Sequence, residues 1–410
     1  MPMNWRASAW AMALAILLCG PVMAQHGAPL SLQAALDLAA KQNLDLNAAR
    51  ERLAVSRATV QIARQRPNPI FNFGTLRDSP HESLFFDQPF EIGGKRGRRI
   101  EVANQEGALT DLEITGLERQ VRRKTREAYF QLSFTQAESA RLLHLLDLAQ
   151  RLDQIARERF EAGDVPQLEV IQAGLEVARA QSEYKVAQQE ERVSLSQLNA
   201  LLNEPATTSW QLMEMLRDLP PTVSLPELVQ SAYNSNPALQ HVAQEQKVEE
   251  SRRALLKAER IPNLDFEYGL DFNSPRDFRV GPRGQITLAL PLFARNQGEI
   301  AQSLAAQRVL NAEEAATKRS VASLVETACF DLDARRTQAE TYRDSLVPVA
   351  QKLESLAEES YRAGKADILV VLTAQRNVQD VEQNYLQSLL SVQNAFAELE
   401  ELVGTPIDQK

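Results

Sequence analysis

Two stretches of similar sequence decide the fold: Phe160-Glu161-Ala162-Gly163-Asp164-Val165-Pro166-Gln167-Leu168-Glu169-Val170 and Tyr361-Arg362-Ala363-Gly364-Lys365-Ala366-Asp367-Ile368-Leu369-Val370-Val371. In each stretch, an aromatic residue and Ala-Gly close one long helical pattern, and another helical pattern starts a few residues later. Glycine just past a helix end supplies the left-handed conformation that ends the helix. We therefore expect Gly163 and Gly364 at the bends of two long helical hairpins, with Asp164 and Asp367 capping the helices that follow.

The segments around the two bends also repeat, so we interpret the chain as two similar halves. The matches lie 193 to 201 residues apart and include Ser31-Leu32 with Ser224-Leu225, Pro67-Asn68 with Pro262-Asn263, and Gly97, Gly163 and Pro205 with Gly298, Gly364 and Pro406. This period is far longer than the unit of a solenoid, so it indicates one duplication. We predict a first repeat at residues 25–223 and a second repeat at residues 224–410.

The first 24 residues have the composition of a cleaved secretory signal. Arg6 precedes a short apolar run from Ala9 to Leu18, and Val22-Met23-Ala24 forms a small-residue cleavage site. The run is shorter than the ~20 residues that a spanning helix needs. Cys19 offers an alternative, a lipidated N-terminus, but bulky Leu18 stands where a small residue is wanted. We therefore expect residues 1–24 to be removed during export.

The mature chain is acidic and rich in Ala, Leu, Gln, Glu and Arg, which is typical of long helices. Without Arg6, 44 basic and 54 acidic residues leave a net charge of −10. This balance argues against a nucleic-acid partner. Cys329 is then the one remaining cysteine, so the sequence predicts neither an intrachain disulfide nor a thiolate metal cluster.

Each half shows the same order of helical patterns. We predict paired helices at 32–41 and 225–235, at 46–64 and 238–259, and at about 98–161 and 299–362. A helix of roughly 38 residues then returns from each bend and ends at Leu202 in the first half and at Val403 in the second. Leu145, Leu148, Leu152 and Ile155 recur at spacings of three and four, as do their counterparts Leu346, Val349, Leu353 and Leu356. An ordinary amphipathic helix would give the same local spacing. The great length of the helices favours a coiled-coil seam.

Four extended segments are predicted at about 69–76, 83–91, 264–272 and 284–292. In the third segment Phe266, Tyr268, Leu270 and Phe272 alternate with Asp265, Glu267, Gly269 and Asp271. This alternation indicates a sheet with one apolar face and one polar face. A soluble sheet on a core gives the same pattern, but no nearby sequence could form that core. We therefore predict strands of a transmembrane barrel with Asp265, Glu267 and Asp271 facing its lumen. Four strands cannot close a barrel, whereas three copies would pool 12.

These features together resemble the outer-membrane efflux proteins of the TolC family, over essentially the whole mature chain. The segment Gln88-Pro89-Phe90-Glu91-Ile92-Gly93-Gly94-Lys95-Arg96 is similar to the segment that leaves the second strand in the CzcC-like cation-efflux branch. The resemblance implies a mainly α fold with a small β part: a homotrimer with an α-barrel tunnel in the periplasm and a 12-stranded β-barrel in the outer membrane of a Gram-negative bacterium. It also implies two protein partners, a periplasmic adaptor and an inner-membrane pump of the resistance-nodulation-division (RND) type.

The resemblance further implies a gate near the bends, where aspartates shortly after the second bend form a ring. Val370 and Thr373 stand where those acids are expected, so any ring would use Asp367 or Glu169. A ring of carboxylates at a constriction attracts cations. A capping role alone is the alternative for Asp164 and Asp367. The candidate residues of the gate and tip are Gly163, Asp164, Glu169, Gly364 and Asp367.

The sequence shows no pattern for catalysis, for a cofactor or for a metal site. The histidines are scattered and lack HExxH spacing: His26, His81, His144 and His241. No Walker loop and no G-x-S-x-G segment occurs. Met213 and Met215 could bind Cu(I), although such a pair near a linker is more often packing. The basic run from Gly93 to Arg99 is expected to be a strand-to-helix joint near lipid headgroups.

The sequence is compatible with three functions. The first is a passive exit duct for divalent heavy-metal cations such as cobalt, zinc and cadmium, which the resemblance implies. The second is a duct of the same family for organic compounds or several drugs. The third is a periplasmic adaptor or scaffold, which also has a long hairpin. Adaptors carry one hairpin flanked by glycine-rich β domains, whereas this chain has two hairpins and four strands, so a duct is favoured.

Overall fold

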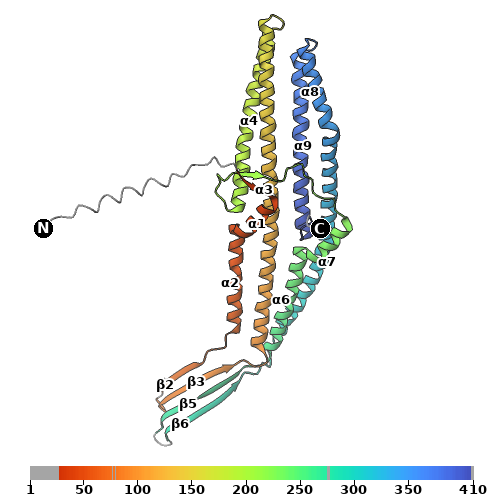
Figure 1. Ribbon diagram of the computed structural model, residues 1–410. Helices are drawn as coiled ribbons and strands as arrows, with labels where there is room; N and C mark the ends of the chain where they lie inside the picture. Colours follow the sequence, from red (N-terminus) through yellow and green to blue (C-terminus); the bar gives the residue numbers. More distant parts are fainter. Residues whose placement is uncertain (1–26, 76, 79, 275–277, 408–410) are drawn as a thin grey trace, which may run out of the picture.

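The computed structural model describes residues 27–75, 77–78, 80–274 and 278–407. The predicted signal peptide at 1–24, with its Cys19 alternative, lies outside these residues. The described chain is elongated, with two helical hairpins at one end and a four-stranded sheet at the other (Figure 1). None of the helices in these ranges combines the length and the apolarity that crossing a bilayer requires.

The two halves contain the same elements in the same order. The first half has α1 (Leu32–Gln42), α2 (Leu44–Arg64), β2 (Ile70–Thr75), β3 (Glu82–Phe90), α3 (Lys95–Glu161) and α4 (Gln167–Leu202). The second half has α5 (Leu225–Ser235), α6 (Pro237–Glu259), β5 (Leu264–Ser274), β6 (Phe278–Leu288), α7 (Gln297–Thr341), the π-helical turn η1 (Tyr342–Leu346), α8 (Val347–Arg362) and α9 (Ile368–Val403). The shorter helices start where the sequence offers a cap, since Asn43 and Asn236 accept backbone N–H groups at the starts of α2 and α6.

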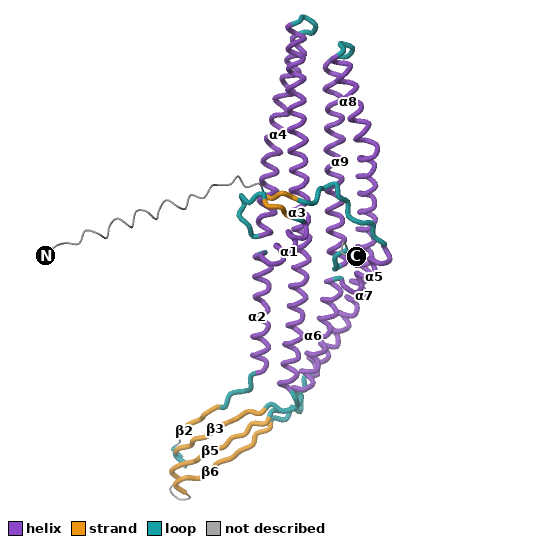
Figure 2. The backbone as a smooth tube through the Cα atoms, viewed as in Figure 1, coloured by secondary structure: helices purple, strands orange, loops and turns teal. Residues whose placement is uncertain are grey.

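The helices form one layer in two tiers. In the hairpin tier α3 packs against both α4 and α9, and α9 packs against α8 (Figure 2). In the tier nearer the sheet, α3 lies between α2 and α6, and α6 packs against α7. The first half therefore ends at α4 and α2 on one edge of the layer, and the second half ends at α8 and α7 on the other.

The sheet has the strand order β2-β3-β5-β6, and every neighbouring pair is antiparallel. The last strand departs from the prediction, because β6 covers Phe278–Leu288 and not 284–292. The alternating pattern continues to Leu290, but β5 begins at Leu264, which pairs with Leu288. No residue of β5 lies opposite the chain beyond Leu288, so the strand ends there.

Both bends contain the expected left-handed glycine, with φ of 84° at Gly163 and 67° at Gly364. The capping prediction is confirmed at Asp367, whose Oδ1 accepts the Leu369 N–H at 3.4 Å. It is wrong at Asp164. Pro166 occupies the cap position of α4 and gives no side-chain cap. Its fixed φ and missing N–H suit the boundary of a helix, which here starts beyond the reach of Asp164.

The predicted coiled-coil seam is buried in only one half. Leu148 and Leu152 of α3 are buried, whereas their counterparts Val349 and Leu353 of α8 are exposed in a single chain. The two helices do not differ in the face that they turn toward the rest of the chain, because Ala156 of α3 and its counterpart Ala357 of α8 are both buried. The other described residues therefore leave the face of α8 that carries Val349 and Leu353 exposed.

Three elements, β1, β4 and η1, had no counterpart in the sequence predictions. Strand β1 (Ala28–Leu30) pairs in parallel with β4 (Trp210–Leu212), which ties the start of the described chain to the join between the halves. The fully buried Tyr129 fixes this pair, because its hydroxyl lies within hydrogen-bond distance of both the Leu30 carbonyl, at 3.0 Å, and Glu214 Oε2, at 2.6 Å. The π-turn η1 ends two residues before Pro348, whose ring would clash with a carbonyl of a regular α-helix.

Candidate functional site

The two hairpins are joined at their tips by a latch of three residues. Tyr361, at the end of α8, is fully buried, and its hydroxyl donates to Glu169 Oε2 of α4 at 3.1 Å. Arg159 of α3 donates to the Tyr361 carbonyl at 3.4 Å, and its guanidinium lies 4.8 Å from the centre of the tyrosine ring. Burial and the nearby Glu169 carboxylate raise the pKa of Tyr361. The phenol therefore stays neutral and remains a hydrogen-bond donor.

Of the residues that the sequence singled out near the bends, Glu169 alone belongs to this latch. Gly163 and Gly364 lie at the tips of separate hairpins, and a Cβ added to either would meet no atom within 4 Å. Asp164 and Asp367 are exposed beside them. The sequence analysis missed Tyr361 and Arg159 as site residues. Tyr361 lies two residues before Ala363-Gly364, and Arg159 lies in the last turn of α3. A single sequence does not show which polar side chain at a bend reaches the other hairpin.

Polar contacts continue along the hairpins below the latch. Glu176 of α4 lies 3.7 Å from the guanidinium of Arg376 on α9, and Gln379 donates to Glu183 at 3.1 Å. An apolar cluster fills the space between the hairpins near the tips and consists of Leu152, Ala156, Ala173, Ala357, Tyr361, Ile368, Val371, Leu372 and Ala374. A change in the angle between the hairpins would have to break this mixed apolar and polar contact.

The four-stranded sheet has one polar face and one apolar face. Asp265, Glu267 and Asp271 share the polar face, where their β3 partners are Pro89, Asp87 and Ser83. Arg283 of β6 reaches Glu267 at 3.1 Å and lies 5.2 Å from the centre of the Phe85 ring on the same face. The opposite face exposes Phe71, Phe73, Phe266, Tyr268 and Leu270. So much exposed aromatic surface marks a face that contacts lipid or protein.

The basic run after β3 is a structural joint. Lys95 is buried and donates to Asn263 Oδ1, which connects α3 to the segment that enters β5. Arg99 forms two hydrogen bonds with Glu91, at 2.6 and 3.1 Å, and these bonds lower the pKa of the Glu91 carboxyl. Arg96 donates to the carbonyl of Arg64 at the end of α2. These residues therefore fix the angle between the sheet and the helices, as the expected strand-to-helix joint requires.

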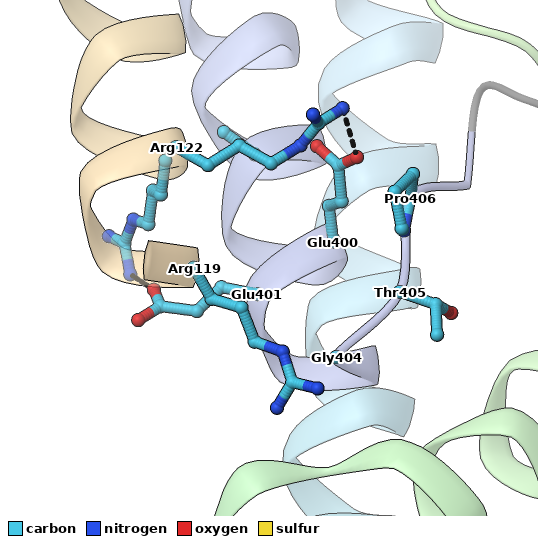
Figure 3. A pocket seen from close by; sticks show the side chains of 9 residues that line it. Arg119, Arg122, Glu400, Glu401, Gly404, Thr405 and Pro406 are labelled. Carbon is cyan, nitrogen blue, oxygen red and sulfur yellow. Dashed lines mark hydrogen bonds and ion pairs between the residues drawn. The ribbon is translucent and has the colours of Figure 1, made fainter. Parts of the chain in front are cut away.

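A cluster of charged residues joins the two halves in the middle of the layer (Figure 3). Arg122 and Arg126 of α3 lie 3.2 and 3.3 Å from Glu400 of α9, and Arg123 lies 2.8 Å from Glu401. A pocket of about 100 Å³ is lined by four of these residues, Arg122, Arg123, Glu400 and Glu401. Because the ion pairs bridge α3 and α9, we interpret the cluster as a clamp between the halves.

No group of three or more His, Cys, Asp or Glu side chains in the described ranges is arranged to hold a metal ion. The candidate site consists of the charged residues on one face of the sheet and the latch between the two hairpins.

Comparison with known proteins agrees with this architecture. The sequence profile of the outer membrane efflux protein family matches residues 35–204 and 228–405. The cobalt-zinc-cadmium resistance protein CzcC of Cupriavidus metallidurans is 27% identical over 391 residues, which are 94% of this chain and 92% of that protein.

Solved structures show the same fold. CusC has a TM-score of 0.76 at 16% identity, with 92% of each chain covered. The outer-membrane channel OprN has a TM-score of 0.73 at 16% identity, covering 92% of this chain and 90% of that one. The open state of the MtrE channel of Neisseria gonorrhoeae has a TM-score of 0.71 at 15% identity, with 92% and 90% covered. The predicted fold class, mainly α with a small β part, is confirmed, and the chain belongs to the outer membrane efflux protein family.

Proposed function

We propose that this protein is the outer-membrane duct of a tripartite efflux system and that it works as a homotrimer. The observation that carries the proposal is the incomplete architecture of one chain. Its sheet ends at two unpaired edges, β2 and β6, and its helical layer ends at two unpaired edges on the same sides. Both edges are satisfied when copies join side by side into a closed ring.

The strand directions support such a ring. Neighbouring strands alternate in direction across the sheet, so β6 of one copy meets β2 of the next in an antiparallel pair. Three copies supply 12 strands, which is above the smallest transmembrane barrel of about eight. In that barrel the aromatic face contacts lipid, and Asp265, Glu267 and Asp271 face the water-filled lumen. Charge on the lipid face is destabilising, by ~2–4 kcal/mol for Arg or Lys at mid-membrane and by less for Asp or Glu, which favours this orientation.

The proposed location is the outer membrane and the periplasm. A chain with a signal peptide at 1–24 and repeats at 25–223 and 224–410 would be exported, with its sheet in the outer membrane and its hairpins in the periplasm. The tips then lie farthest from the membrane, where a periplasmic adaptor and an inner-membrane RND pump would reach them. The exposed tip glycines Gly163 and Gly364 leave room for such a partner.

The cargo we propose is a divalent heavy-metal cation such as cobalt, zinc or cadmium. The related CzcC carries this resistance in its name, and the acids on the polar face of the sheet would favour cations. A duct passes its cargo without holding it, so no bound metal, cofactor or catalytic step is part of the proposal. The gate is the latch of Arg159, Glu169 and Tyr361, which opens when the adaptor stabilises separated hairpins.

The test is a strain that lacks this protein, grown with zinc, cobalt, cadmium and a panel of drugs. We expect sensitivity to the metals, and full resistance when the wild-type gene is restored. Sensitivity to drugs alone would replace the proposed cargo with organic compounds. Membrane fractionation tests the architecture: we expect a heat-sensitive trimer in the outer membrane, whereas a monomer in the inner membrane would support an adaptor or scaffold.

A further inference from the structure

We propose that neighbouring copies meet at the tips through an apolar contact, formed by Phe160 and Ile171 of one copy and Leu353 and Val370 of the next. The inference rests on the proposed trimer and adds the residues that join its copies at the gate. In a single chain these four side chains are 43%, 61%, 46% and 50% exposed. Large apolar side chains gathered at one end of a molecule mark a contact surface.

The internal duplication points to the partner. In a ring of similar halves, each half meets a similar half on both sides, once within a chain and once between copies. The offset of 201 residues relates Phe160 to Tyr361 and Glu169 to Val370. Within one chain, Tyr361 of the second half bonds Glu169 of the first half. The equivalent contact between copies therefore joins Phe160 of one copy to Val370 of its neighbour.

The coiled-coil seam leads to the same surface. Leu152 is 1% exposed, because the second half of its own chain covers it with Val371 and Leu372 in the apolar tip cluster. At the same offset, Leu353 corresponds to Leu152, and Ile171 corresponds to Leu372. Leu353 is exposed in one chain because the residue that would cover it, Ile171, belongs to the first half of another copy. The unburied half of the seam is thus explained by an interface.

A second copy fits this surface better than an adaptor helix does. One apolar patch lies on the first hairpin, formed by α3 and α4, and the other lies on the second hairpin, formed by α8 and α9. The described sheet likewise ends at two edge strands, β2 of the first half and β6 of the second half. A head-to-tail contact of these edges continues both the sheet and the helical layer. An adaptor helix would cover the patch on the second hairpin but would leave the edge of the sheet open.

The gate then contains two different kinds of contact. Within each copy the hairpins are joined by the polar latch of Tyr361, Glu169 and Arg159, whereas between copies they meet through apolar side chains. The duplication has thus kept the position of the contact and changed its chemistry. A change that weakens one kind of contact should leave the other in place.

Disulfide cross-linking tests the contact in full-length protein in outer membranes. Ile171→Cys and Leu353→Cys are combined in a Cys329→Ala background, in cells without the adaptor, and treated with a mild oxidant. We expect covalent dimers and trimers. The matched control combines Ile171→Cys with Ala350→Cys, which is buried in its own hairpin, and should stay monomeric.

Three outcomes would overturn the inference: a disulfide within one chain, which keeps the mass of a monomer; no cross-link in a protein that is a trimer by mass; or a cross-link that requires the adaptor. A wild-type protein that is monomeric by mass would instead overturn the proposed trimer itself. A second measurement is the closed-state conductance of Phe160→Ala in a planar bilayer. We expect an increase with the trimer intact, and an unchanged conductance would count against the contact.

Discussion

The hydroxyl of Tyr361 donates a hydrogen bond to Glu169 across the two hairpins, although 192 residues separate them in the sequence. The bond joins the end of α8 to the start of α4, and these helix ends lie at the end of the molecule farthest from the sheet (Figure 1). Its donor is fully buried, and its acceptor is in the first turn of α4. This pair gives the proposed gate a specific closed contact, and its strength can be changed without altering the fold.

Tyr361→Phe should make the closed duct leakier. The substitution removes one hydrogen bond, which contributes about 1 kcal/mol, and keeps the ring under Arg159. We expect a larger closed-state conductance in planar bilayers and increased entry of bulky antibiotics into cells. Tyr184→Phe is the matched control, because the Tyr184 hydroxyl bonds Gln188 within α4 only. Equal conductance in both variants would remove Tyr361 from the gate.

Glu354→Gln should stabilise the second hairpin at neutral pH. Burial raises the pKa of Glu354, and the nearby Glu382 and Glu358 raise it further, whereas His144 lowers it. A carboxyl with a raised pKa in the folded state lowers the free energy of unfolding at pH values above that pKa. This loss disappears as the pH falls through the folded pKa, because the group becomes neutral in the fold.

The melting temperature of the purified protein checks this prediction. We expect Glu354→Gln to melt higher than wild type at neutral pH, with the difference vanishing near pH ~4, where a free Glu carboxyl takes up its proton. The exposed Glu359→Gln on the same helix is the control and should melt like wild type. A difference that stays the same at both pH values would exclude ionisation of Glu354 as its cause.

Much of the fold could be predicted because its signals are local. The glycines at 163 and 364, the alternation around Phe266 and the repeat of the two halves each follow from short patterns in the sequence. The first turn of α4 was misjudged, because a proline two residues after Asp164 overrides the capping acid. The end of β6 could not be predicted because the length of β5, and not the pattern of β6, sets it.

The latch and the clamp depend on long-range contacts, which a single sequence does not contain. Arg159 and Tyr361 look like ordinary residues at helix ends, and Glu400 looks like one of several acids in α9. The sequence predicts a coiled-coil seam in both halves of the chain, but the seam residues of the second half are exposed in a single chain. A periodic pattern shows that a helix face is apolar and leaves open whether the same chain covers it.

Gly269→Ala should prevent the sheet from forming correctly. A Cβ at this position would meet the carbonyl of Leu84 and the backbone of Phe85 on the neighbouring strand. Forced contacts of this kind cost about 1–3 kcal/mol. We expect fewer trimers in the outer membrane. Gly284→Ala is the control, since a Cβ there would meet no atom within 4 Å. Normal trimer yield in Gly269→Ala would contradict the β3–β5 pairing.

Glu400→Ala should separate the two halves of the chain. The Glu400 carboxylate, with 7% of its side chain exposed, lies between the guanidinium groups of Arg122 and Arg126. Removing one partner of a buried ion pair costs about 3–5 kcal/mol, because the remaining charge is left in the interior. Arg126 also stacks over the Phe396 ring, 4.6 Å from its centre, so it cannot easily turn toward water.

We expect this variant to melt well below wild type and to be cut by protease in the join between the halves, near Pro220. Glu398→Ala removes an exposed acid from the same helix and should behave like wild type. The triple change of Glu400, Arg122 and Arg126 to Met, Leu and Leu supplies a further check. If the loss comes from unpaired buried charge, apolar replacement of the whole cluster should restore most of the melting temperature. A triple variant as unstable as Glu400→Ala would mean that the cluster acts through its shape and not through its charge.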